Sequence, residues 1–267
     1  MITVLNNSNN NSCNKNNSSN YMNKSHNTIY RCIKKYLSNK NNIFFVMKSY
    51  YICKEFKNNI KGYHYINNSP IKEAIWENIN VDIVKDKCSV GDFANGNHKS
   101  GKDNKFNNWN ISNKTCKFDE KGKTSVSSYR LTSVCSNRNK GKKEDIISEI
   151  EKRDLSFDYY SILGRKEYFS NNGDLEFIKY YWFIIPKDYY VFNVKKYDLE
   201  IKQGKNGKSK GKIVGWKSKY YDISFSMSSQ LWFHFKFDDI KQYLISSVKV
   251  KICDQVLSYG DIYKLKK

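Results

Sequence analysis

The stretch Asp92–Lys123, DFANGNHKSGKDNKFNNWNISNKTCKFDEKGK, decides the fold. Short alternating segments are separated in it by Asn and Gly, a pattern typical of consecutive antiparallel strands. One strand is predicted from 109 to 114, WNISNK. Successive side chains of a strand point to opposite faces, so Ser112 and Lys114 are predicted to share a face. A hairpin before this strand brings Asp103 beside both of them.

A carboxylate, a hydroxyl and an ammonium group at one place suit phosphodiester hydrolysis. A carboxylate can hold Mg²⁺, which takes few protein ligands and keeps several of its waters. The metal activates water and offsets the charge that develops at phosphorus. A nearby lysine can position or deprotonate that water. Asp103, Ser112 and Lys114 are therefore the candidate catalytic residues, and Asp92 is a further candidate ligand.

A helix is predicted directly upstream, in the sequence SPIKEAIWENIN. Ser69 can cap it and Pro70 suits its first helical position. Its apolar face is expected to carry three isoleucines, Ile71, Ile75 and Ile79. Glu73 and Glu77 are spaced four residues apart, so they lie on one side of this helix.

The downstream sequence predicts one more helix and then mostly strands. EDIISEIEKRD, residues 144–154, has helical spacing with Ile146, Ile147 and Ile150 facing inward. From 157 to 250 short apolar segments alternate with turns. The segment 202–219 contains seven lysines, four glycines and no acid, and is predicted to be a loop. The fold class expected is α+β, with a mixed central β-sheet flanked by helices and a β-rich C-terminal half.

The motif KSGKD at 99–103 followed by WNISNKT at 109–115 resembles the core of PD-(D/E)XK nucleases, in which an Asp precedes a strand ending in acid-x-Lys. Two positions depart from that pattern: Lys102 stands where a proline is usual, and Ser112 stands in place of the second carboxylate. Members of this family can recruit a carboxylate from a neighbouring helix. Glu77 is the first candidate for that role, and Glu73 the second.

The resemblance implies a restriction-endonuclease-like core and a Mg²⁺-dependent endonuclease that cleaves double-stranded DNA at specific sites. Asp103, Glu77 and Asp92 are then the candidate metal ligands, and Glu77 is a further candidate catalytic residue. The hydroxyl-rich segments are similar in style to those of type II restriction endonucleases, which usually cut as homodimers. The expected DNA-contacting residues are polar or basic and lie in four segments: Lys99; Ser127, Ser128, Tyr129 and Arg130; Lys208, Lys210 and Lys212; Ser228, Ser229 and Gln230.

Composition favours a polyanionic partner. Lysine and arginine number 47 against 26 acidic residues, giving a formal net charge of +21. A low-GC genome also raises the lysine content, and this remains a competing explanation for part of the charge. No apolar run approaches the roughly 18 residues of a spanning helix, so an integral membrane protein is excluded and no membrane partner is expected.

The seven cysteines form no CxxC pair, which indicates free thiols in a reducing compartment. No secretory signal is visible at the N-terminus, so a cytoplasmic location is expected. Residues 1–27 are rich in Asn and are predicted to form a disordered arm. Residues 28–267 are predicted to form a single domain, with its core at about 66–200 and a DNA-contacting region at about 200–267. His234, in the segment LWFHF, is expected on the solvated face of a strand, and it has no partner at motif spacing.

Two other functions compete with the nuclease. One is a non-catalytic DNA- or RNA-binding protein, and the other is an interaction protein whose lysines reflect codon use alone. The convergence of Asp103, Glu77 and Lys114 in space distinguishes the nuclease from the binding protein.

Overall fold

The computed structural model describes residues 43–84, 90–91, 102–136, 140–205, 207–225, 229–252, 256–258, 261 and 264. The chain divides into two units, Met1–Val46 and Met47–Lys267, and nearly all of these residues belong to the second. The predicted Asn-rich arm lies outside the described residues.

The elements follow the predicted class, helices first and then mainly strands. The α-helices are α2 (Ile43–Met47), α3 (Tyr50–Ile66), α4 (Glu73–Val84), α5 (Lys143–Asp154) and α6 (Phe237–Ile240). Short 3-10 helices are η1 (Val194–Lys196), η2 (Gly207–Ser209) and η4 (Lys241–Tyr243). The strands are β1 (Val90–Gly91), β2 (Asn104–Phe106), β3 (Trp109–Lys117), β4 (Lys123–Arg130), β5 (Tyr159–Phe169), β6 (Leu175–Pro186), β7 (Glu200–Gln203), β8 (Ile213–Lys217), β9 (Tyr221–Ser224), β10 (Gln230–Lys236) and β11 (Leu244–Lys251).

The strands form two sheets. The first has the order β1-β2-β3-β5-β6-β11, and the second has the order β4-β10-β9-β8-β7. Every described pair is antiparallel except β3 with β5, which run parallel. The α+β class and the mixed sheet are therefore confirmed. The boundary predicted at about residue 200 does not coincide with the division into two sheets, because β4 joins the second sheet and β11 returns to the first.

β5 and β6 occupy the middle of the first sheet. Residues 160–164 of β5 and 182–185 of β6 are buried on both faces, and these parts of the strands are mostly apolar. On one face Tyr160, Ile162 and Phe183 pack into a core shared with the second sheet, which contributes Val126 and Phe233. This core is largely aromatic, and Tyr160 lies 4.6 Å from Phe192, centroid to centroid.

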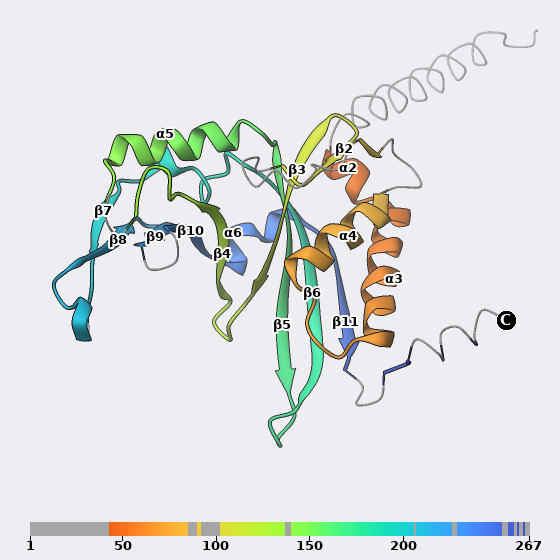
Figure 1. The fold of residues 1–267 in the computed structure, drawn as a ribbon. Helices are drawn as coiled ribbons and strands as arrows, with labels where there is room; N and C mark the ends of the chain where they lie inside the picture. The colour runs from red at the N-terminus through yellow and green to blue at the C-terminus, as the bar shows by residue number, and fades with distance from the viewer. Residues whose placement is uncertain are drawn as a thin grey trace, which may run out of the picture. The chain divides into compact units, whose positions relative to one another are not determined.

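α3 and α4 cover the other face of the first sheet (Figure 1). Trp76 on α4 donates its indole N–H to the backbone oxygen of Ser161 at 3.1 Å. Phe56 on α3 stacks on Trp182 of β6 at 5.5 Å. The hydroxyl of Ser161 accepts from Trp182 Nε1 and from Asn80 Nδ2, both at 3.0 Å. Buried hydrogen bonds thus join α4 to the first sheet.

The predicted start of α4 was wrong by three residues. Ser69 and Pro70 precede the helix, which begins at Glu73. The backbone N–H of Ile71 donates instead to the hydroxyl of Tyr180 at 3.1 Å, so a tertiary contact takes the place of a first helical turn. The buried face is centred on Trp76 and Asn80, and Ile75, predicted to be inside, is 37% exposed.

Other expectations are confirmed. α5 spans Lys143–Asp154, one residue longer than predicted, with Ile146 and Ile150 buried and Ile147 partly buried. The second half of the chain is mostly strand, although the predicted loop at 202–219 contains β8. Within the described residues, no helix has the length and apolar character required to cross a membrane.

Replacing Ser161 with Val is expected to lower the free energy of unfolding by about 1–3 kcal/mol, because a buried indole N–H loses its acceptor. Urea unfolding followed by tryptophan fluorescence measures the change. Ser247→Val on β11, at a half-buried site where the hydroxyl has no described partner, is the control and should change stability little. Equal losses in both variants would contradict the role of Ser161.

Candidate active site

A short hairpin brings Asp103 to β3. β2 pairs with β3 over three residues, from Asn104↔Ile111 to Phe106↔Trp109. Asn107 in the turn has φ of 51°, a left-handed conformation that Asn tolerates better than most residues. Asp103 precedes β2, and its N–H donates to the oxygen of Ile111 at 2.9 Å. The local sequence therefore places Asp103 next to Ser112, as predicted.

The carboxylate of Asp103, just before the start of β2, extends the hydrogen bonding along the edge of β3. Its Oδ2 accepts the backbone N–H of Asn113 and the hydroxyl of Ser112, the latter at 3.3 Å. Two donors on one oxygen fix the carboxylate at the edge of β3. Asp103 thus has a structural role, which any catalytic role must accommodate.

Lys114 lies between two carboxylates from different elements. Its Nζ is 2.9 Å from Glu73 Oε1 on α4 and 4.0 Å from Asp103 Oδ2. It also donates to the oxygen of Asn113 at 2.7 Å. The lysine side chain is only 10% exposed, against 36% for that of Glu73. The ammonium is therefore held in place and largely shielded from water.

Three acids, Glu73, Glu77 and Asp103, make up the carboxylate cluster around Lys114. Burial raises the pKa of Asp103 above its ordinary value, and Glu73 raises it further, although Lys114 and two hydrogen bonds oppose the change. Burial also raises the pKa of Glu77, with added repulsion from Asp103 and Glu73. Desolvation is thus the largest cause of the raised pKa of both carboxyls, and repulsion among the three acids adds to it.

The sequence prediction and the structure differ on the helix acid. Asp103, Ser112 and Lys114 come together, as expected. Glu73, the second candidate, forms the ion pair with Lys114, whereas Glu77 acts on the cluster through its charge. Asp92 lies outside the described residues.

No group of three or more His, Cys, Asp or Glu side chains in the described part of the chain is arranged to hold a metal ion. Mg²⁺, however, is commonly held by one or two carboxylates together with substrate phosphates and water. Asp103 and a helix glutamate supply the number of carboxylates that this smaller requirement asks for.

A buried polar network next to the site joins α4 to β3 and β5. Asn80 of α4 donates to Asn113 Oδ1 at 2.5 Å and to Ser161 Oγ at 3.0 Å. Asn113 Nδ2 and Asn104 Oδ1 are buried without a described partner. Unsatisfied buried polar atoms cost stability and are uncommon in folded proteins.

The expected DNA-contacting residues divide into exposed and buried groups. Lys208, Lys210 and Lys212 are exposed between β7 and β8, and Arg130 is exposed at the end of β4. Ser127 is partly exposed. Lys99 and Ser228 lie outside the described residues.

Four of the expected contacts have side chains turned inward. Tyr129 is buried and donates to Asp154 Oδ1 at 2.8 Å. Gln230 is buried and donates to the oxygen of Ser128 at 2.7 Å. The hydroxyls of Ser128 and Ser229 are buried as well. Burial removes these side chains from any surface contact with DNA, which corrects the sequence-based expectation.

Neither a protein-family model, nor a curated protein, nor a solved structure matches this chain. The chemistry of the site is therefore inferred from the geometry of its described side chains.

Sequence reasoning missed one polar group on the outer face of the second sheet. Ser125 Oγ lies 2.8 Å from His234 Nδ1, and His234 Nε2 lies 3.3 Å from Asp222 Oδ1. As predicted, the His234 side chain is solvated, at 41% exposure. Its partners are remote in sequence, and the alternation of β4, β9 and β10 was the only available signal.

Replacing Glu77 with Gln is expected to stabilise the folded chain at pH 7. The pKa of Glu77 is higher in the folded than in the unfolded chain, so its ionisation lowers stability as the pH rises through the interval between the two values. Gln removes that penalty at neutral pH, and the gain should vanish below about pH 4, where the carboxyl is protonated in both states.

Thermal unfolding midpoints from pH 3 to pH 8 measure this effect. Glu176→Gln, at an exposed position of β6, is the matched control and should show no comparable gain. A Glu77→Gln variant that is less stable than wild type at pH 7 would contradict the electrostatic argument.

Proposed function

We propose that the chain is a Mg²⁺-dependent endonuclease acting on double-stranded DNA. One observation carries the proposal: Lys114 Nζ lies within 4.0 Å of Asp103 and 2.9 Å from Glu73, so an Asp, a helix Glu and a Lys from three segments meet at one point. The sequence resemblance had assigned catalytic roles to Asp103 and Lys114 and named Glu73 among the helix acids.

Asp103, with Glu77 or Glu73, would hold the metal. A bound Mg²⁺ supplies water activation and stabilisation of negative charge. Ser112 donates its hydroxyl to the Asp103 carboxylate, a contact that would fix the orientation of this ligand. Asn113 does the same through its backbone N–H.

Lys114 would act at the water that attacks phosphorus. In hydrolysis the water oxygen forms a new bond to phosphorus, the ester P–O bond breaks, and the leaving oxygen takes up a proton. An ammonium group fixed by Glu73 and the oxygen of Asn113 can orient that water and offset the developing charge. Its burial makes the interaction stronger than it would be in water.

A non-catalytic nucleic-acid-binding protein is the second candidate. Asp103 closes the edge of β3 and Lys114 joins α4 to β3, so both residues also stabilise the fold. The exposed lysines between β7 and β8 suit phosphate contacts in either case. Cleavage of DNA distinguishes the two proposals.

Lys114→Met is expected to lower Mg²⁺-dependent cleavage at least about 100-fold, because the group that acts on the attacking water is lost. Plasmid DNA incubated with Mg²⁺ or with EDTA at low salt, followed by gel electrophoresis, measures the cleavage. Binding in EDTA should remain close to that of wild type.

Lys105→Met, on the neighbouring strand β2, is the matched control and should cleave at nearly the wild-type rate. Intact DNA that is retarded by the wild-type chain would favour the non-catalytic protein. A Lys114→Met variant as active as wild type would contradict the nuclease proposal.

The triple variant Lys208→Gln, Lys210→Gln and Lys212→Gln is expected to weaken the salt dependence of DNA binding. Each lost phosphate contact reduces the slope of log K against log salt by about 0.9, so the slope should become shallower by up to about 2.7. Fluorescence anisotropy with a labelled duplex at several salt concentrations measures it.

The control triple is Lys54→Gln, Lys57→Gln and Lys61→Gln, which removes the same charge from the exposed side of α3. An equal change in both triples would mean that only net charge matters.

A further inference from the structure

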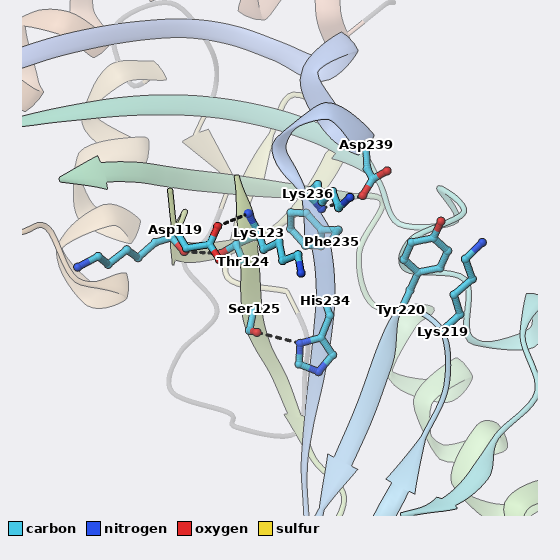
Figure 2. Close-up of a pocket in the computed structure, with 11 residues that line it drawn as sticks. Asp119, Lys123, Thr124, Ser125, Lys219, Tyr220, His234, Phe235, Lys236 and Asp239 are labelled. Carbon is cyan, nitrogen blue, oxygen red and sulfur yellow. Dashed lines mark hydrogen bonds between the residues drawn. The ribbon is translucent and has the colours of Figure 1, made fainter. Parts of the chain in front are cut away.

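One pocket in the described part of the chain is lined by residues that differ in chemical character from the carboxylate cluster. It has a volume of about 810 Å³ and lies between strands β4 and β10 and the segment 219–220 (Figure 2). The side chains that matter are mainly basic, hydroxylic or aromatic: Lys123, Ser125, Lys219, Tyr220, His234 and Lys236. We refer to it as the His234 pocket.

A row of side chains from β4, β9 and β7 orients His234, which is on β10. Ser125 of β4 contacts its Nδ1, and Asp222 of β9 contacts its Nε2. Lys202 of β7 pairs with the same Asp222, and it also donates to Ser224 Oγ at 3.0 Å. Hydrogen bonds and the charges of Lys202 and His234 outweigh burial and hold the pKa of Asp222 below its ordinary value.

Asp222 and Ser125 contact the two ring nitrogens of His234 from opposite sides. In the tautomer that carries its proton on Nε2, His234 donates to Asp222, and Nδ1 accepts the hydroxyl proton of Ser125. The imidazole ring lines the pocket, and Figure 2 shows its hydrogen bond with Ser125.

The walls carry more positive than negative charge. Four lysines line the pocket against two aspartates. Each aspartate is engaged by a backbone N–H: Asp119 accepts from Lys123 N and Asp239 accepts from Lys236 N, both at 2.7 Å. The ammonium groups of Lys123 and Lys236 form no ion pair within the described part of the chain, so an anion in the pocket meets uncompensated cations.

An aromatic ring lies beside these cations. Tyr220 is half-buried, and it packs edge-on against Tyr190 and Tyr197 at 5.4 and 5.0 Å. Lys219 Nζ lies 5.0 Å from its ring centroid. A ring held in this way offers a surface for a planar base, next to lysines that suit its phosphate.

We propose that the His234 pocket binds a nucleoside phosphate. Lys123 and Lys236 hold the phosphate group, and Tyr220 contacts the base. The volume lies within the usual range for small-ligand sites, roughly 300–1,000 Å³. A free mononucleotide and one nucleotide of a single strand present the same chemistry. The inference does not depend on metal-dependent cleavage at Lys114.

The test is binding of two probes to the full chain in EDTA, where no metal-dependent cleavage occurs. Calorimetry with AMP and anisotropy with a short labelled single-stranded DNA give the affinities. The double variant Lys123→Gln, Lys236→Gln should bind at least one probe about tenfold more weakly, as expected from losing charge-assisted contacts. The control double, Lys57→Gln with Lys61→Gln, should change either affinity less than about threefold.

A second variant tests the base contact. Tyr220→Leu is expected to weaken AMP or strand binding about tenfold and to leave competition by inorganic phosphate unchanged. Thermal unfolding midpoints show whether Tyr220→Leu still folds. If it does not, the lysine double variant still tests the proposal, because Lys123 and Lys236 are exposed.

The outcomes separate the two sources of the ligand. If the lysine double variant loses affinity only for AMP, the ligand is a free nucleotide. If it loses affinity only for the single-stranded DNA, the ligand is a nucleotide within a strand. Equal effects of the pocket and control doubles on both probes would overturn the proposal. None of these results depends on whether Lys114→Met abolishes cleavage.

Discussion

The parallel pairing of β3 with β5 is the constraint on which the rest of the described fold depends. It runs from Ile111↔Tyr159 to Lys117↔Arg165. Parallel neighbours need a crossover connection, and here the chain leaves the first sheet through β4 and returns after α5. β4 then becomes an edge strand of the second sheet. One crossover thus ties the two sheets together and creates the core that Tyr160 and Phe233 share.

The edge of β3 that faces β2 is unpaired beyond Asn104, the first residue of β2. Asp103 satisfies the backbone N–H of Asn113 at that edge, and Lys114 is close enough to Glu73 on α4 to form an ion pair. The site therefore arises where a short strand stops beside a longer one. Its supporting residues, Asn80 and Ser161, lie on the helix-covered face, so the position of α4 and the geometry of the carboxylates are coupled.

The sequence predicted what depends on neighbours along the chain. Asp103, Ser112 and Lys114 lie within twelve residues, and one hairpin with period-two alternation is enough to bring them together. The α5 helix and the β-rich second half were likewise local inferences. The start of α4 was not predictable in this way, because the N–H of Ile71 is taken by Tyr180, which is 109 residues away. Which glutamate meets Lys114 depends on that start.

Which polar side chains are buried was the second feature that the sequence did not predict. A run such as Ser127–Arg130 gives no sign that Tyr129 points into the core and donates to Asp154. The polar contacts of His234 were hidden for the same reason, since Ser125 is 109 residues from it and becomes its neighbour only when β4 joins β10. Composition indicated a polyanionic partner, but only the packing of the strands shows which lysines and hydroxyls face outward.

The two proposed sites have opposite charge, and this has a physical consequence. The carboxylate cluster around Lys114 repels a phosphate until a cation offsets it, because three acids meet one ammonium. In the proposed functions, the His234 pocket and the lysines between β7 and β8 would bind phosphate without a metal. A net charge of +21 favours long-range attraction of a polyanion. Under these proposals, association and engagement of the acidic site would be separable steps, and only the second would require a divalent cation.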